Sequence, residues 1–450
     1  MENLVITFFA LLLGLVLGLG IFIPGFEKMW LFSMGFKLTD ASLWIYLTAI
    51  LLLTGIAAGI YPAFYISKFQ VVKIIKGSVQ FGQKNPLTKL FLGIQLVIAC
   101  ILITSAVMFT QNSAYLSKRS WGYDQEAVLY VRVPDRASFD QLNAVLVQDP
   151  DILLTSGSHH HLGENYTTAV VRMPERQYEV DQLSVDADYF QTMGIRLQEG
   201  RGFKDNYASD KQAIVVNDFF VKNTVVEKPM EQRLRIDSVE YAVVGVVSDF
   251  HNKSFSNKVR PTIFKLSDPD DYQYLSMKVR SGSAKQTYKA LQEKWAKLFP
   301  ETPFQGGFQE DVWGNYFKGL NIAAIFWKVV AFIAVLLASL GLYGLVKINL
   351  AGRVKEFSIR KVLGAGTKNI AAIIMDQYAM LLATALILGA PVSYTLIKLL
   401  IESAYEYHMP INYFGVVIAV IILMLTVLTT IAIQIRKVSK ANPVNGLKVE

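Results

Sequence analysis

Six long blocks of mostly apolar residues constrain the fold of this sequence more than any other feature. They cover residues 5–23, 43–66, 88–109, 321–346, 370–401 and 414–435. Each block reaches the length of about 20 residues that an α-helix needs to cross a bilayer. Since helices satisfy their own backbone hydrogen bonds in lipid, we predict an α-helical membrane protein with about six transmembrane helices.

Two of the blocks are less regular than the others. Block 5–23 stands where a signal peptide would stand, but Glu2 is its only charged neighbour and it lacks a small-residue cleavage motif. We therefore interpret it as a membrane helix. Block 370–401 is too long for one straight crossing, and Gly389 and Pro391 are expected to kink it or to end its core.

A polar segment, residues 110–320, separates the third and fourth blocks and is far too long for a loop. Its residues 127–133 (AVLYVRV) and 241–250 (YAVVGVVSDF) have the β-branched and aromatic content of strands. Residues 137–148 and 283–299 have apolar side chains at helical spacing. The segment is therefore predicted to be one large α+β domain.

The net charge of +8 is unevenly distributed along the chain. The basic segments 67–89 and 347–369, the C-terminal tail and Glu2 together carry +12, whereas residues 110–320 carry −3. Short basic loops stay in the cytoplasm, so both termini are predicted inside and the large domain outside. The positive charge thus indicates the orientation of the protein in a membrane. Because it lies in short loops next to membrane helices, we expect no nucleic-acid partner.

The sequence carries no familiar catalytic motif. It has no Gly-Lys dipeptide and hence no Walker A loop, no G-x-S-x-G elbow and no H-E-x-x-H helix. His159, His160 and His161 are consecutive, so their side chains diverge, and a solvated loop is favoured over a metal site. Asp249 and His251 follow a predicted strand, which favours a polar turn. We expect no enzyme activity, no metal and no cofactor on this chain.

Two glycine pairs predict close packing of membrane helices. Gly14 and Gly18, like Gly55 and Gly59, are four residues apart and share one helix face. The pattern is common in membrane helices, so it supports a bundle without identifying one.

An internal repeat links the two ends of the chain. Residues 67–76 (SKFQVVKIIK) and 439–448 (SKANPVNGLK) share the frame S-K-x-[QN]-x-V-[KN]-x-[IL]-K, and each copy follows a membrane helix. The first two blocks are therefore predicted to correspond to the last two. This predicts that the N-terminal part of a duplicated protein is absent from the chain, through truncation, and a genuine six-helix variant is the alternative.

Four segments resemble the FtsX-like permeases of the MacB type of ABC transporter, in the duplicated form of Bacteroidetes-like bacteria. They are residues 59–77 (GIYPAFYISKFQVVKIIKG), 243–255 (VVGVVSDFHNKSF), 341–370 (GLYGLVKINLAGRVKEFSIRKVLGAGTKNI) and 441–450 (ANPVNGLKVE). The resemblance implies residues 1–66 as two transmembrane helices closing a first permease unit, 67–87 as a cytoplasmic basic segment, 88–109 as a transmembrane helix, 110–320 as a MacB-like periplasmic core domain, 321–346 as a transmembrane helix, 347–369 as a cytoplasmic coupling segment, 370–436 as two transmembrane helices and 437–450 as a cytoplasmic tail.

The most specific of these motifs contains a short amphipathic run on the predicted cytoplasmic face. Glu356 and Arg360 are spaced as i,i+4 partners on a helix. From the residues alone, a basic helix lying on anionic lipid is one interpretation. The resemblance instead favours a coupling helix that docks on an ATPase subunit. The residues assigned to coupling are Arg353, Lys355, Glu356, Ile359, Arg360, Lys361, Val362, Leu363 and Gly364.

The resemblance also implies a function. It implies a multi-pass permease of the bacterial inner membrane, with an ABC-type ATP-binding subunit that binds the ATP, and mechanotransmission to the periplasm for export or efflux. A periplasmic adaptor or an outer-membrane channel would be a further partner, beside the lipid bilayer. Two alternatives stay open: a regulatory scaffold controlling a periplasmic hydrolase or sensor, and an ion-coupled carrier. The carrier has little support, because Lys328 and Asp376 lie near the ends of their blocks.

Overall fold

The computed structural model describes residues 2–30, 35, 37–67, 86–173, 176–204, 208–224, 228–237, 239–351, 353–363 and 367–440. The predicted basic segment 67–87 lies outside the described residues except at its ends, as does the tail from residue 441 onward. The chain forms two compact units. The helical unit contains Met1–Phe109, Ile322–Ile397 and Asn412–Glu450, and the globular unit contains Thr110–Asn321 and Lys398–Ile411.

The helical unit contains long apolar helices and a few short ones. They are α1 (Glu2–Leu17), the π-helical η1 (Gly18–Phe22), α2 (Ile23–Trp30), α3 (Ala41–Ser67), α5 (Pro86–Leu116), α10 (Gly314–Ala351), α11 (Val354–Val362), α12 (Thr367–Ala404) and α13 (Phe414–Lys440). Within the described part of the chain, five helices are long and apolar enough to cross a membrane, and Ala41–Ile56 is a shorter apolar helix. Helix α12 continues through Pro391, so this proline does not end it.

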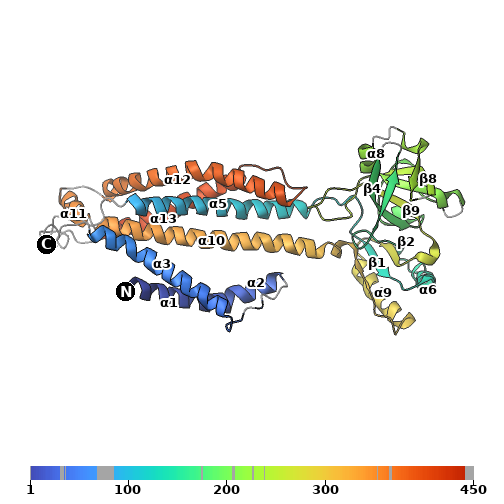
Figure 1. Cartoon of the computed structure of the whole chain (residues 1–450), viewed down its shortest axis with the longest axis horizontal. Helices are drawn as coiled ribbons and strands as arrows, with labels where there is room; N and C mark the ends of the chain where they lie inside the picture. Colours follow the sequence, from blue (N-terminus) through green and yellow to red (C-terminus); the bar gives the residue numbers. More distant parts are fainter. Residues whose placement is uncertain are drawn as a thin grey trace. The chain divides into compact units, whose positions relative to one another are not determined.

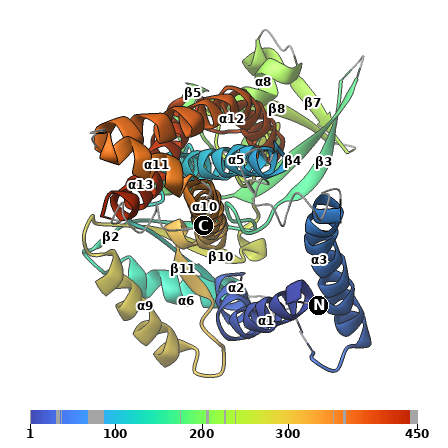
Figure 2. The same ribbon diagram turned by 90° about the vertical axis from the view of Figure 1, so that its left-hand side faces the viewer.

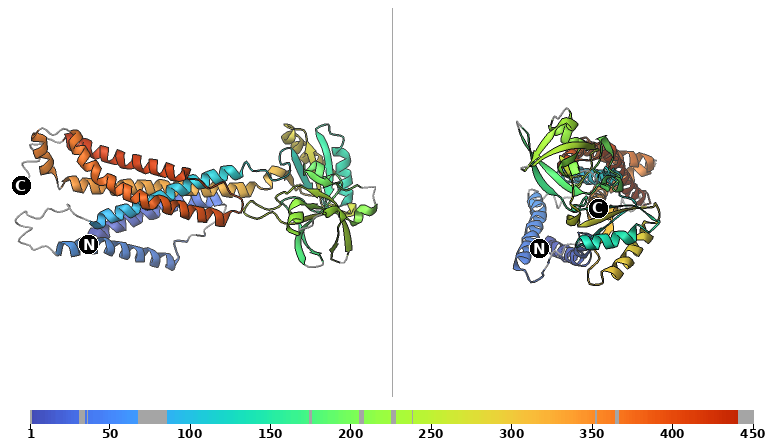
Figure 3. Two further views of the ribbon diagram at one scale, coloured as in Figure 1. Left: turned by 90° about the horizontal axis from the view of Figure 1, so that it is seen from above. Right: turned by 90° about the vertical axis from the view of Figure 1, so that its right-hand side faces the viewer.

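Helices α5, α10, α12 and α13 lie side by side (Figures 1 and 3) and share one apolar core. Small side chains allow the close approach that membrane helices need: Ala99 and Ala419 are fully buried. A Cβ added to Gly389 of α12 would lie 3.4 Å from the Cβ of Cys100 on α5. Large apolar side chains point outward instead, such as Ile387, which is 71% exposed. Such a surface is stable only against lipid or another apolar partner.

The globular unit is a mixed α+β domain. Its helices are α6 (Arg136–Leu146), α7 (Tyr189–Thr192), α8 (Asp218–Thr224) and α9 (Ala284–Leu298), with short 3₁₀ turns η2 (Ala208–Gln212), η3 (Pro229–Glu231), η4 (Pro269–Asp271) and η5 (Gln309–Asp311). Its strands are β1 (Val128–Arg132), β2 (Ile152–Ser158), β3 (Thr167–Arg172), β4 (Gln177–Val185), β5 (Leu197–Gly200), β6 (Ala213–Asn217), β7 (Arg233–Ile236), β8 (Val239–Val247), β9 (Thr262–Leu266), β10 (Tyr274–Val279) and β11 (Gly306–Phe308).

Six of the strands close into a ring, in the order β4-β3-β7-β8-β6-β9. The parallel pairing of β9 with β4 completes the ring, and β5 pairs with β8 outside it. Alternate residues of all six strands point into one apolar core, among them Val171, Val180 and Ile263. This part of the unit is therefore a small closed barrel, which we call the barrel lobe.

The remaining strands form a second lobe, in the order β11-β1-β10-β2. Helices α6 and α9 lie beside this sheet (Figure 2), and their buried residues Leu142 and Trp295 share a core with Leu129 of β1. The N-terminus of α6 is capped by Asp135, whose carboxylate accepts from the Ser138 amide at 2.8 Å. We call this part the helix-backed lobe.

The structure confirms the predicted fold class, because apolar helices of membrane-spanning length occur together with a large α+β domain. The two predicted strands appear as β1 and β8, and the two predicted helices appear as α6 and α9.

Candidate functional site

Helix α11 follows directly on the end of α10. The Arg353 amide donates to the Leu350 carbonyl at 3.0 Å, and the Phe357 amide donates to the Arg353 carbonyl at 3.0 Å. These two bonds connect the end of α10 to the start of α11. Of the predicted coupling residues that the structure describes, Arg353 and Leu363 flank α11 and the others lie on it.

Glu356 is the centre of the charge arrangement on α11. Its Oε1 lies 2.8 Å from Nη2 of Arg360, which is the predicted i,i+4 pair. Its Oε2 lies 3.4 Å from Nε of Arg353. All three side chains are about one-third to two-fifths exposed, so each pair contributes only about 0.5 kcal/mol. Their main effect is to hold two guanidinium groups along one side of the helix.

Phe357 attaches α11 to the helix bundle. Its side chain is 3% exposed and lies in the bundle core together with Leu350 and Tyr378. The Tyr378 hydroxyl in turn accepts from the Asn349 side-chain amide at 2.7 Å, which connects α12 to α10. Reasoning from the sequence missed Phe357, although it is the only aromatic residue between 352 and 369.

Apolar side chains of α11 and its C-terminal end are left uncovered. Ile359 is 46% exposed, Val362 is 65% exposed and Leu363 is 80% exposed. They stand near Arg360, whose side chain is 41% exposed. The helix thus buries Phe357 in the bundle and presents apolar and cationic groups to its surroundings. We call Ile359, Arg360, Val362 and Leu363 the open face of α11.

Some predicted residues lie outside the described part of the structure. This holds for the side chains of Lys355 and Lys361 and for the whole of Gly364. Their role in coupling stays a prediction, as does that of the open face.

The four predicted packing glycines differ in their surroundings. Gly55 is buried, and an added Cβ would clash with Leu4 of α1. The Cβ positions of Gly14 and Gly18 meet no described atom within 4 Å. Gly59 lies in α3, and its surroundings are outside the described part. Their role in packing also stays a prediction.

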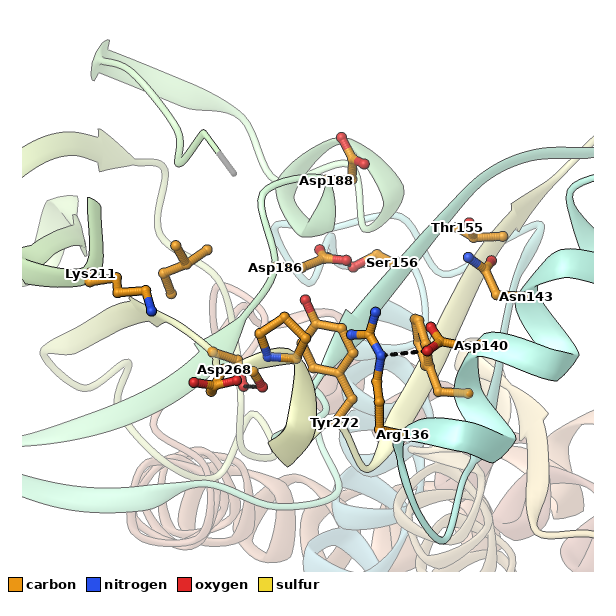
Figure 4. A pocket seen from close by; sticks show the side chains of 14 residues that line it. Arg136, Asp140, Asn143, Thr155, Ser156, Asp186, Asp188, Lys211, Asp268 and Tyr272 are labelled. Atoms are coloured by element: carbon orange, nitrogen blue, oxygen red, sulfur yellow. Dashed lines mark hydrogen bonds and ion pairs between the residues drawn. The ribbon is translucent and has the colours of Figure 1, made fainter. Parts of the chain in front are cut away.

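The globular unit contains a cavity of about 660 Å³ between its two lobes (Figure 4). Arg136 projects into it from α6, where Nε lies 2.8 Å from the Asp140 carboxylate. On the opposite side, the Ser156 hydroxyl donates to Asp186 at 2.6 Å. The lining is completed by Phe139, Asn143, Thr155, Asp188, Lys211, Leu266, Ser267, Asp268, Pro269 and Tyr272. Among the described residues, no group of three His, Cys, Asp or Glu side chains is placed to hold a metal ion.

The three histidines lie in a loop, as predicted, and His159 is partly exposed, but the prediction that the loop is solvated is wrong for His160 and His161. His160 is 4% exposed and His161 is fully buried. The His161 Nε2 lies 2.6 Å from Oε1 of Gln309, and its ring stacks on Tyr130 at 4.3 Å. Burial lowers the pKa of His161 to about 4, so this imidazole is neutral in the folded unit. His160 and His161 thus belong to the core, which the polar composition of this run did not indicate.

Asp249 and His251 each have structural partners. The Asp249 carboxylate accepts from the Phe219 amide at 2.7 Å and thereby caps α8, while burial raises its pKa. The His251 amide donates to the Trp121 carbonyl at 2.8 Å, and its ring is nearly buried. Burial, followed by the nearby positive charge of Arg119, lowers the pKa of His251 to about 4. The Asp249 side chain therefore positions the start of α8, and the His251 ring is part of the packed interior.

Two protein-family models match the chain. Residues 90–294 match the MacB-like periplasmic core domain. Residues 328–443 match the FtsX-like permease C-terminal model, and this region includes α11.

Named relatives and solved structures are similar to parts of the chain. An "Uncharacterized ABC transporter permease" of Methanocaldococcus jannaschii is 23% identical over 201 residues, 43% of this chain and 49% of that protein. A "Probable export ATP-binding/permease protein" of Pseudomonas fluorescens is 21% identical over 273 residues, 58% of this chain and 42% of that protein. The chain thus spans about half the length of these relatives or less.

Two solved structures cover the globular part. The periplasmic region of MacB from Actinobacillus actinomycetemcomitans is 13% identical, with a TM-score of 0.34, over 45% of this chain and 97% of that one. The extracellular domain of the transporter YknZ from Gram-positive bacteria is 14% identical, with a TM-score of 0.31, over 40% of this chain and 98% of that one. The two matched regions, residues 90–294 and 328–443, are therefore similar to the two parts of an FtsX-like permease that carries a MacB-like periplasmic core domain.

Proposed function

We propose that this chain is the permease subunit of an ABC transporter and that a separate ATP-binding subunit docks on the open face of α11. The observation that carries the proposal is the arrangement of α11. Phe357 fixes it to the bundle, while Val362 and Leu363 remain 65% and 80% exposed beside a guanidinium group. Apolar side chains next to cations at a helix end suit a protein groove better than water.

The rest of the proposed mechanism follows from helix continuity. Helices α5 (Pro86–Leu116) and α10 (Gly314–Ala351) each continue from the helical unit into the globular unit without interruption. A movement imposed at the docking helix is therefore passed along stiff elements to the periplasmic domain. We place the protein in the bacterial inner membrane, with ATP bound by the partner and no catalytic group on this chain. Export or efflux, with a periplasmic adaptor or outer-membrane channel, is the use that we propose for this motion.

The test separates docking from the stability of α11. The chain is co-expressed with the ABC-type ATP-binding subunits of its source organism, and co-purification is measured for the double variant Glu356→Arg, Arg360→Glu. This exchange keeps an i,i+4 ion pair, so the helix is retained while its surface charge is rearranged. We expect the recovered ATP-binding subunit to fall roughly tenfold or more, as for a central interface residue.

The matched control is Lys347→Glu, a charge reversal at an exposed residue near the end of α10. It should leave co-purification unchanged. Equal recovery from the wild type, the exchange variant and the control would contradict docking on α11. Failure of any ATP-binding subunit to co-purify with the wild type would instead favour the ion-coupled carrier.

A further inference from the structure

The connection between α12 and α13 is packed as part of the globular unit, although the two helices it joins belong largely to the helical unit. Residues Lys398–Ile411 group with Thr110–Asn321. Tyr405 and Tyr407 of this segment pack against the buried cluster that contains Trp121 and Phe255. A short connection between two membrane helices is thereby built into the domain.

Tyr407 makes the densest set of these contacts. Its amide donates to the Phe255 carbonyl at 3.1 Å. Its hydroxyl accepts from the Val259 amide at 3.3 Å. The neighbouring Glu406 lies 3.5 Å from Lys258, but both of these side chains are well exposed and the pair contributes little. The attachment therefore depends on Tyr407.

The Tyr407 ring is held from two sides. The Arg119 guanidinium lies 4.6 Å from its centroid and 5.8 Å from that of Phe255. The His251 ring meets it edge-on at 4.8 Å. Arg119 also donates to the Tyr115 hydroxyl on α5 at 3.3 Å. Arg119 and Tyr407 are half-buried, and a cation against an aromatic face at such a site is attracted to the ring.

Two polar contacts near the ends of α5 and α10 complete the joint. The Met409 amide donates to the Asn112 side-chain carbonyl of α5 at 3.0 Å. The Ser113 hydroxyl of α5 donates to the Asn321 side-chain carbonyl of α10 at 3.0 Å. The segment 398–411, α5 and α10 are thereby fastened to one another inside the globular unit.

We propose that Tyr407 is a positioning residue that makes the α12–α13 connection move as part of the periplasmic domain. This inference rests on the proposed function and adds a third link to it. Motion that enters at α11 reaches the domain through α5 and α10, and also through α12 and its latched connection. We call the contacts of Tyr407 with Phe255, Val259 and Arg119 the latch. Without the latch, residues 405–413 would form a flexible loop, and the movement of α12 and α13 would not reach the domain.

The first experiment uses the full chain alone in lipid nanodiscs and measures hydrogen exchange. Tyr407→Ala is expected to raise the exchange of peptides covering 255–259 and 405–411 by roughly tenfold. Tyr407→Phe keeps the ring and should stay close to the wild type. The matched control is Tyr413→Ala, since Tyr413 is 66% exposed and lies outside the globular unit. Equal exchange in Tyr407→Ala and Tyr413→Ala would overturn the latch.

The second experiment adds the ATP-binding subunit and compares exchange before and after trapping with ATP and vanadate. In the wild type and in Tyr413→Ala, trapping is expected to change the exchange of peptides within 398–411. In Tyr407→Ala this ATP-dependent change should be lost, while the ATP-binding subunit still co-purifies and hydrolyses ATP. An undiminished change in Tyr407→Ala would refute transmission through Tyr407. If no ATP-binding subunit co-purifies with the wild type, the proposed function fails, and the first experiment still decides whether the latch exists.

Discussion

Phe357 fixes the position of α11, because among the described side chains of that helix it is the one buried in the bundle core. Replacing a buried phenylalanine by alanine costs about 3–5 kcal/mol, which exceeds what the Glu356 ion pairs supply. We expect Phe357→Ala to release α11, to raise its hydrogen exchange and to abolish co-purification of the ATP-binding subunit. Ile359→Ala, at a 46% exposed side chain, is the stability control and should leave the exchange of α11 unchanged.

Buried histidines make the globular unit sensitive to acid. Burial lowers the pKa of His161 from 6.5 to about 4. Burial, with the charge of His159 second, lowers the pKa of His160 to about 4. Between these values the unfolded chain binds more protons than the folded one, so stability falls as pH decreases from about 6.5 toward 4. Each of these two pKa shifts changes the free energy of unfolding by about 3 kcal/mol once the pH is below both pKa values.

The prediction is a fall in the thermal unfolding midpoint of the globular unit between about pH 7 and pH 4, measured by tryptophan fluorescence. His161→Gln should flatten this dependence, since glutamine does not titrate. The comparison variant is His159→Gln, at a partly exposed ring, which should retain most of the wild-type slope, since burial and not the charge of His159 is the larger cause of the lowered pKa of His160. Parallel curves for His161→Gln and the wild type would contradict the assignment of the acid sensitivity to His161.

At the scale of one element, the open face of α11 should be dispensable for folding and necessary for docking. We expect Val362→Ser with Leu363→Ser to leave the unfolding temperature within about 1 °C of the wild type, since both side chains are mostly exposed. Recovery of the ATP-binding subunit should fall roughly tenfold. A loss of stability without a loss of co-purification would mean that this face packs against its own chain.

The predictability of the elements followed the range of the interactions that form them. The apolar blocks predicted the membrane helices, since each block carries its own signal. The strands at β1 and β8 and the helices α6 and α9 were predictable from local periodicity for the same reason. The pairing of β9 with β4 joins residues about 80 positions apart, such as Asp181 and Thr262. No local sequence pattern predicts a pairing over such a separation.

The candidate site was only partly predictable. Spacing indicated the Glu356–Arg360 pair correctly. The burial of Phe357 was not evident from the sequence. A single aromatic residue in a basic segment shows no helical repeat of apolar positions that would indicate a buried face. Consecutive histidines suggested solvent, whereas tertiary contacts with Gln309 and Tyr130 placed His161 in the core. Likewise, Gly389 packs against α5 without belonging to a recognised glycine motif.

At the scale of the whole molecule, the topology predicted from the basic loops puts residues 110–320 outside the cytoplasm and the segment 347–369 inside it. Cys100 is buried, so cysteines introduced elsewhere can be labelled against a low background. In intact spheroplasts, we expect a membrane-impermeant maleimide to label Val147→Cys, at a 62% exposed residue of the globular unit. Leu363→Cys should react only after the membrane is permeabilised. The reverse pattern would contradict the orientation inferred from the basic loops.

The closed ring of strands has a mechanical consequence. A strand at the edge of an open sheet can be peeled away one hydrogen bond at a time, but each of the six strands in the barrel lobe has a neighbour on both sides. Tension applied to such a ring loads many bonds in shear together, and none can yield first. Tension on the globular unit should therefore act first on the junction between the two lobes, where β2 and β4 are joined through the single residue pair Ser158 and Val185.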